Sequence, residues 1–403
     1  MNLKSYSIVT ASYWGLTLTD GALRMLVLLH FHTLGYSPVS LAFLFLLYEC
    51  CGILTNLLGG WLGSRVGLKF TLHAGLALQV VALVMLSLTD PGWAVGLSVA
   101  YVMATQALSG IAKDLTKMSS KSAVKLLVRD ENGALFKWVS ILTGSKNTLK
   151  GVGFLLGGVL LTWLGFAGAL WTMACGLALV LLAALLFLKQ DMGRTKVKVK
   201  FTQLFSKSRE MNWLSAARLF LFASRDVWFV VALPVFLKDS FDWSFNQVGS
   251  FMAAWVIGYG TVQSLTPRLI ARRPGAEGSE TSWEVRAATV WALALACVSA
   301  AIAGLVAAGF AVTVGVIGGL ACFGIVFAVN SSLHSYLILA YADGDDVSID
   351  VGFYYSANAA GRLVGTLLSG LLYLQGGIEA ALWGSAIFVA ATWLLPLRLP
   401  TLD

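Results

Sequence analysis

The chain has 403 residues, of which 58% are hydrophobic and only 12% are charged, and its formal net charge is +8. Soluble globular domains contain about twice this fraction of charged residues, and the mean hydropathy of this chain is +0.80. These values exclude a soluble enzyme or a nucleic-acid-binding domain and indicate an integral membrane protein. We expect no nucleic-acid partner, because the basic residues lie mainly in every second connection between apolar helices and within those helices.

About twelve apolar runs have the length, about 20 residues, that a helix needs to cross a hydrocarbon core of about 30 Å. They cover residues 7–34, 39–63, 70–89, 93–116, 136–163, 167–188, 213–237, 246–270, 285–307, 310–340, 351–375 and 378–397. We therefore predict an all-α membrane protein with twelve transmembrane helices in two six-helix bundles. The basic segment 189–212 is too polar to span, and we place the bundles on either side of it, at 1–188 and 213–403. The first run follows MNLKSYS directly, so we expect it to be retained rather than cleaved as a signal peptide.

Basic residues in short connections predict the orientation of the helices, because such loops resist translocation. The bases that fall on one side are Arg65, Lys69, Lys117, Lys121, Lys125, Arg129, those of segment 189–212, Arg268, Arg272, Arg273 and Arg286. Lys238 is the exception on the other side, and the acids of 343–350 carry little topological weight. We expect both termini in the cytoplasm and the chain in the inner (cytoplasmic) membrane of the cell.

One stretch of the first predicted helix, Thr17 to Tyr36, carries an acid, Asp20, and a base, Arg24, four residues apart. Residues at this spacing lie on one face of a helix and can reach each other. A charged side chain at mid-membrane costs roughly 2.5–3.5 kcal/mol on insertion scales, so it usually faces a partner or a water-filled cavity. Two interpretations stay open, a structural ion pair that locks the helix to a neighbour and part of a transport pathway.

The other ionisable residues inside the predicted spans include more bases than acids. They are Glu49, Lys146, Lys150, Arg218, Arg225, Asp226 and Arg362, and Lys113 and Lys117 extend the excess toward the cytoplasmic end of the fourth span. Because an unpaired buried base costs several kcal/mol, the surplus predicts a substrate that carries several negative charges. Guanidinium groups suit phosphate or carboxylate oxygens. For the two lysines of the fifth span and for Arg218, the alternative is that the side chain extends to the membrane interface.

Neutral polar residues recur at helical spacing near these bases. Tyr354 and Asn358 precede Arg362 at four-residue intervals, and Asn330 and His334 are four residues apart on the preceding span. Each set therefore shares one helix face and is a candidate lining for a substrate site. A separate face of small residues, which predicts close contact with another helix, contains Gly361, Gly365 and Ser369.

The two halves of the chain show a weak internal repeat. At a constant offset of 206, the residues Asp20, Gly52 and Thr55 correspond to Asp226, Gly258 and Thr261. Parallel repeats of six helices are typical of two-bundle transporters.

The connection GGWLGSRVGLKF, residues 59–70, resembles the signature loop of the major facilitator superfamily, with Arg65, Gly67 and Lys69 in the family pattern. Ser64 and Leu68 depart from that pattern, since the family usually has an acid and a base there, and the gating salt bridge attributed to the loop needs that acid. The resemblance implies a transporter that works by alternating access, with the charge-bearing spans around a central cavity.

Three longer stretches, TLTDGALRMLVLLHFHTLGYSP, ALFKWVSILTGSKNTLKGVGFLLGG and DVGFYYSANAAGRLVGTLLSG, resemble the ArsJ family of permeases from arsenic-resistance operons. This resemblance implies export of 1-arseno-3-phosphoglycerate, which forms when a glyceraldehyde-3-phosphate dehydrogenase uses arsenate in place of phosphate. Such a substrate is anionic at both ends. Our hypothesis is that Arg24, Lys146 and Lys150 bind one end, whereas Arg225 and Arg362 bind the other.

Protons are a candidate coupling ion, and the residues that could exchange them are Asp20, Glu49, Asp226 and His334. An organophosphate exchanger or importer would need the same cations, whereas a drug exporter would need an acidic and aromatic cavity. A membrane sensor or scaffold would normally carry a soluble signalling domain. The five cysteines lie in apolar spans without metal-ligand spacing, and nothing resembles a nucleophile elbow or a phosphate-binding loop. We therefore expect a monomeric transporter with no enzymatic activity, cofactor or bound metal.

Overall fold

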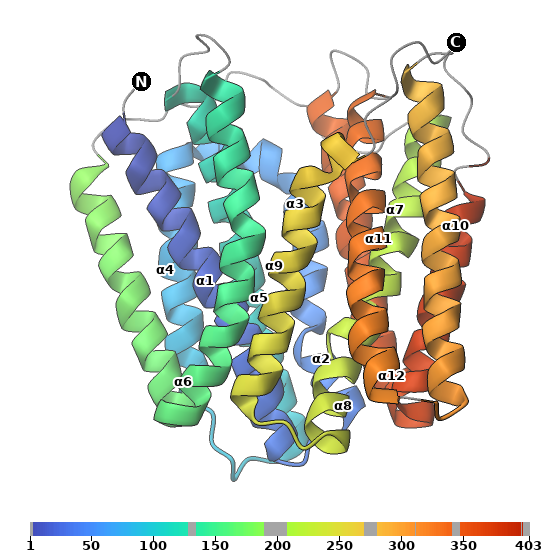
Figure 1. Ribbon diagram of the computed structural model, residues 1–403. Helices are drawn as coiled ribbons and strands as arrows, with labels where there is room; N and C mark the ends of the chain where they lie inside the picture. The colour runs from blue at the N-terminus through green and yellow to red at the C-terminus, as the bar shows by residue number, and fades with distance from the viewer. Residues whose placement is uncertain are drawn as a thin grey trace. The chain divides into compact units, whose positions relative to one another are not determined.

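The computed structural model describes residues 3–127, 134–188, 208–269, 280–310, 312–340, 347–395 and 397. Within these ranges the regular structure is helical, and in each half of the chain the long helices run side by side (Figure 1). In chain order the helices are α1 (Leu3–Thr33), α2 (Pro38–Leu44), α3 (Leu46–Val66), α4 (Leu68–Leu86), α5 (Val95–Leu127), α6 (Ala134–Phe187), α7 (Arg209–Phe229), α8 (Ala232–Ser240), α9 (Phe245–Leu269), α10 (Glu280–Ala307), α11 (Val312–Ala340) and α12 (Val347–Leu394).

These labels do not correspond one to one with membrane crossings. The pairs α2–α3 and α7–α8 each form a single crossing with a break inside it, at 38–58 and 209–240. Conversely, α6 and α12 each contain a sharp kink, and their apolar parts, 43 and 42 residues long, suffice for two crossings each. Together with α1, α4, α5, α9, α10 and α11, the described residues therefore hold twelve crossings, and the predicted all-α fold is confirmed.

Glycine and proline explain three of these four interruptions, those of α6, α12 and α7–α8. The kink of α6 is at Gly165 and that of α12 at Gly376 and Gly377, and Gly165 and Gly377 have φ values of 67° and 62° that disfavour residues with a Cβ atom. Helix α7 ends just before Pro234, whose ring would collide with the carbonyl of the residue four positions earlier. The hydroxyl of Ser369 accepts hydrogen bonds from the N–H groups of Val231 and Ala232, at 3.2 and 3.0 Å, and so satisfies the start of α8.

The contacts between Cα atoms divide the chain into two compact units. Unit 1 contains Met1–Tyr36, Phe43–Lys200 and Leu237–Val256, and unit 2 contains Ser37–Ala42, Phe201–Phe236 and Ile257–Asp403. Most of the predicted linker, 189–212, lies outside the described residues, and the bundle boundaries at 188 and 213 stay a prediction. A buried apolar core lies inside each unit, around Leu16 and Leu177 in unit 1 and around Leu214 and Leu333 in unit 2.

Glycines four residues apart bring one pair of helices into close contact in each unit. In unit 1, Gly153 and Gly157 of α6 lie against the backbone of α1 at Leu18 and Ala22. In unit 2, Gly361 and Gly365 of α12 lie against the backbone of α7 near Leu219, Ala223 and Asp226. The predicted small-residue face of Gly361, Gly365 and Ser369 is therefore confirmed as a helix contact. This contact fixes the position of the charged residues that α7 and α12 carry.

We expect Gly361→Ala to destabilise the protein by about 1–3 kcal/mol, because the new Cβ atom would collide with the backbone of Leu219. The matched control is Gly304→Ala in α10, where a Cβ atom meets open space, and there the better helix propensity of alanine should leave stability unchanged or raised. Thermal unfolding of the purified variants in detergent measures the difference. Equal unfolding temperatures for the two variants would contradict the close contact between α7 and α12.

Candidate functional site

A buried carboxylate shared by two arginines is the centre of the charged residues in unit 2. The Asp226 side chain is 1% exposed, and its Oδ1 atom accepts from Nε of Arg225 at 2.6 Å and pairs with Nη2 of the same guanidinium at 2.5 Å. Its Oδ2 atom lies 3.4 Å from Nε of Arg362 in α12. One negative charge thus faces two positive charges, so the group keeps a net positive charge when both arginines are ionised.

The ring of Phe222 holds a third arginine close to this group. Arg218, Phe222 and Arg225 are spaced along one face of α7, and the guanidinium carbons of Arg218 and Arg225 lie 4.3 and 4.9 Å from the centroid of the Phe222 ring. These distances place the two guanidinium carbons no more than about 9 Å apart, each in cation–π contact with the same ring. Phe222 was not among the predicted residues, although its position between two arginines on one helix face is visible in the sequence.

Arg218 has no ion-pair partner in the part of the chain that the structure describes. Its residue is only 3% exposed, and its Nη1 atom donates to the Ser331 carbonyl at 3.0 Å. Its guanidinium carbon also lies 5.1 Å from the centroid of the Tyr354 ring, which is fully buried. The Arg218 side chain is therefore buried against α11 and α12, and its depth in the membrane stays a prediction.

Some of the predicted polar residues of α11 and α12 lie close to Arg218, and others do not. His334 and Asn330 are fully buried, and neither ring nitrogen of His334 has a hydrogen-bond partner among the described residues. Asn330 donates to the Val326 carbonyl of its own helix at 3.2 Å, while its Oδ1 atom has no such partner in the described ranges. Tyr354 contacts Arg218, whereas Asn358 is half-buried further along α12. Several buried polar atoms of unit 2 therefore have no hydrogen-bond partner among the described residues.

In unit 1, the acid and the base of α1 both contact α3. Arg24 donates to Oε1 of Glu49 at 2.7 Å, and both side chains are buried. Asp20 accepts a hydrogen bond from the Tyr48 hydroxyl at 2.6 Å. The Tyr48 ring also lies 4.1 Å from Nζ of Lys113 and 5.2 Å from the guanidinium carbon of Arg24. In each unit, therefore, two cations contact one aromatic side chain, and in unit 1 the hydroxyl of that side chain also donates to a carboxylate.

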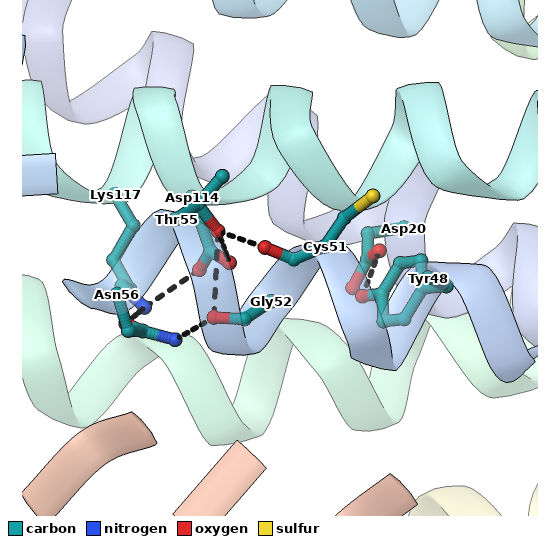
Figure 2. A network of polar contacts seen from close by, with 8 residues as sticks. All are labelled: Asp20, Tyr48, Cys51, Gly52, Thr55, Asn56, Asp114 and Lys117. Atoms are coloured by element: carbon teal, nitrogen blue, oxygen red, sulfur yellow. Dashed lines mark hydrogen bonds and ion pairs between the residues drawn. The ribbon is translucent and has the colours of Figure 1, made fainter. Parts of the chain in front are cut away.

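A second polar network, which was not predicted from the sequence, joins α3 to α5. Figure 2 shows the residues of α3 that take part on one side of that helix, with Asp114 and Lys117 of α5 facing them. Asp114 accepts from the Thr55 hydroxyl at 2.7 Å and from Nζ of Lys117 at 2.7 Å, and Lys117 also donates to Asn56 at 2.8 Å. The prediction that Lys117 adds to an unpaired positive surplus is therefore wrong, because Asp114, buried three residues earlier, neutralises it.

The remaining predicted residues are the two lysines of α6 and the three residues of the predicted gating loop. Lys146 and Lys150 are half-buried, and Nζ of Lys150 lies 5.6 Å from the centroid of the Phe154 ring. Gly67, with φ of 96°, forms the turn between α3 and α4, and Lys69 is half-buried in the first turn of α4. The side chain of Arg65, the third residue of the predicted gating loop, lies outside the described residues.

Corresponding residues of the internal repeat form similar hydrogen bonds at the two acids but different ones at the two threonines. Asp20 and Asp226 both accept hydrogen bonds from another side chain, whereas Thr55 reaches Asp114 and Thr261 donates to the Ile257 carbonyl of its own helix. Among the described residues, no group of three or more His, Cys, Asp or Glu side chains could hold a metal ion. The five cysteines are free thiols.

Comparison with known proteins gives matches to transporters. A family model described as Major Facilitator Superfamily matches residues 8–342. The crystal structure of a POT family transporter in complex with 5-aminolevulinic acid is similar with a TM-score of 0.74 and 16% identity, over 98% of this chain and 95% of that one. An inward-facing bacterial homologue of the iron transporter ferroportin is similar with a TM-score of 0.70 and 14% identity, over 99% of both chains. At these identities the likeness concerns the fold. The comparison with curated proteins found no match.

The Arg24–Glu49 contact permits a test of the two interpretations of α1. Arg24→Met or Glu49→Leu alone should destabilise the protein by about 3–5 kcal/mol, because each leaves one buried charge without its partner. The double variant should recover most of this loss, since it buries no charge at that position. Thermal unfolding of the four proteins measures the coupling, and single variants as stable as the parent would contradict a structural ion pair.

Transport by the stable double variant then distinguishes the two roles. If the pair only locks α1 to α3, the double variant should transport at the parental rate. If Arg24 also contacts the substrate, the double variant should be folded and inactive, which is the result that we expect.

Proposed function

This chain belongs to the Major Facilitator Superfamily and is a secondary transporter, and we propose that it exports a small organic anion with several negative charges, specifically 1-arseno-3-phosphoglycerate. Transporter activity rather than enzymatic activity, and a multi-pass position in the membrane, follow from the family. Substrate, direction and the placement of both termini in the cytoplasm belong to the proposal.

The observation that carries the proposal is the excess of buried positive charge in unit 2. Arg218, Arg225 and Arg362 are gathered near Phe222 and Asp226, and the ion pairs of Arg225 and Arg362 share one carboxylate. Arg218 has no carboxylate partner in the described residues. In a medium as apolar as a bilayer, such a base requires a counter-charge, and an anionic substrate would supply it. A phosphate or an acyl arsenate offers several oxygens that match guanidinium geometry.

Unit 1 supports the same substrate class in a weaker form. Its Lys113 and Arg24 approach the Tyr48 ring from distances of 4.1 and 5.2 Å, with Asp20 bonded to the hydroxyl of that ring. Lys146 and Lys150 of α6 add two half-buried cations. A drug or cation exporter would require an excess of acids instead. We therefore favour the anion exporter over that function.

The identity of the anion is supported by the resemblance of three long stretches to the ArsJ family, and two of them contain Arg24 and Arg362. That family acts after a glyceraldehyde-3-phosphate dehydrogenase has joined arsenate to the three-carbon substrate, so export of the product would confer arsenate resistance. An organophosphate exchanger or importer would use the same arginines. The direction of net transport, measured in inverted and in right-side-out vesicles, separates these functions.

We expect Arg218→Gln and Arg225→Gln to reduce transport by about 10- to 100-fold, the cost of losing one charge-assisted hydrogen bond to the substrate. The assay is accumulation of labelled arsenate in inverted vesicles, supplied outside with the dehydrogenase, glyceraldehyde 3-phosphate and NAD. Label should accumulate only when the dehydrogenase is present. The matched control is Arg286→Gln, because Arg286 is exposed at the start of α10, and it should transport normally.

Parental rates for both arginine variants, in vesicles that contain equal amounts of folded protein, would exclude the substrate site in unit 2. Accumulation of label without the dehydrogenase would exclude the organoarsenical as the required substrate.

Asp226 is our candidate for a group that exchanges a proton when the substrate binds. Its carboxylate and the anionic substrate would compete for the guanidinium groups of Arg225 and Arg362. We expect an imposed pH gradient to drive accumulation in vesicles with the parental protein and to have no effect with Asp226→Asn. Accumulation by the parental protein that ignores the gradient would remove protons as the coupling ion.

A further inference from the structure

The kinked helix α12 contains a hollow that takes no part in the charged clusters. It lies between the two arms of this helix, beside the turn at Gly376, and has a volume of about 580 Å³. This volume is within the range of about 300–1,000 Å³ that is typical of small-molecule sites. Its walls are Leu368 and Leu372 from the first arm and Ala380, Trp383 and Ile387 from the second. The hollow is therefore almost entirely apolar.

The hollow borders on the lipid rather than on a water-filled path. Trp383 and Ile387 on its second arm are 42% and 69% exposed. In a segment that crosses a membrane, apolar side chains with this much exposure face the acyl chains of the bilayer. The walls contain no basic side chain that could pair with an anionic substrate. A lipid chain is the ligand that such a groove meets at the highest concentration.

One charged residue, Glu379, lies at the rim of the hollow. It follows the turn at Gly376 and Gly377 by two residues, which places it near the end of the crossing, at the depth of lipid headgroups. Its side chain is half-buried and forms no hydrogen bond or ion pair within the described ranges of the chain. A carboxylate at that depth attracts a cationic headgroup and repels an anionic one.

We propose that this groove binds a phospholipid with a primary ammonium headgroup, phosphatidylethanolamine, whose acyl chain fills the hollow and whose ammonium group pairs with Glu379. The ammonium group donates hydrogen bonds to the carboxylate, which the methylated headgroup of phosphatidylcholine cannot do. Trp383, one turn further along the helix, contributes an aromatic wall near the interface, where such side chains are favoured. The site is independent of the transported substrate.

The test is native mass spectrometry of the full-length protein with phosphatidylethanolamine, phosphatidylcholine and phosphatidylglycerol that carry identical acyl chains. The parental protein should retain phosphatidylethanolamine in preference to the other two. Glu379→Gln should lower that preference by about two- to fivefold, the effect of one partly exposed ion pair. Ala380→Trp, which fills the hollow, should reduce retention of all three lipids.

Asp90→Asn is the matched control, because Asp90 is an exposed acid in the turn between α4 and α5 and does not line the hollow. It should leave lipid retention unchanged, and equal unfolding temperatures should show that all variants are folded. An unchanged preference in Glu379→Gln would overturn the headgroup assignment. Full lipid retention in Ala380→Trp, or a dimer mass in place of bound lipid, would overturn the groove as a lipid site.

Discussion

The cost of a charge without a partner in an apolar surrounding determines most of what is specific to this protein. A chain with 12% charged residues has few charges to place, and each buried one must be neutralised, hydrogen-bonded or used. Lys117 and Asp114 satisfy each other and belong to the structure of unit 1. Arg218 has no such partner among the described residues and is 3% exposed. The contrast between a base with a carboxylate partner and a base without one distinguishes the scaffold from the candidate site.

In each unit one aromatic ring contacts two cations. Phe222 contacts two guanidinium groups in unit 2, and Tyr48 contacts an ammonium and a guanidinium group in unit 1. Each such contact contributes on the order of 0.5–2 kcal/mol, depending on how well it is desolvated. This is less than the cost of an unpaired buried charge. The rings therefore contact the cations without neutralising their charge, which a full set of carboxylates would do.

Close helix packing places these charges where they can act. Gly361 and Gly365 let α12 approach α7 closely enough for Arg362 to share the carboxylate of Asp226. Gly153 and Gly157 bring α6 equally close to α1 in unit 1. In lipid, packing of small residues replaces the hydrophobic effect as the force between helices. In unit 2, the glycines that pack α12 against α7 therefore also set the separation of Arg362 and Asp226.

The sequence by itself determined the membrane location, the twelve crossings, the small-residue face of α12 and the excess of buried bases, because length, hydropathy and helical spacing are local properties of the chain. It did not reveal that Arg24 pairs with Glu49, that Asp114 neutralises Lys117, or that Phe222 and Tyr48 each contact two cations. Except for the spacing of Phe222, these facts depend on which helices pack together and on their rotation about their axes. Partner choice between helices is a long-range property that only the tertiary structure decides.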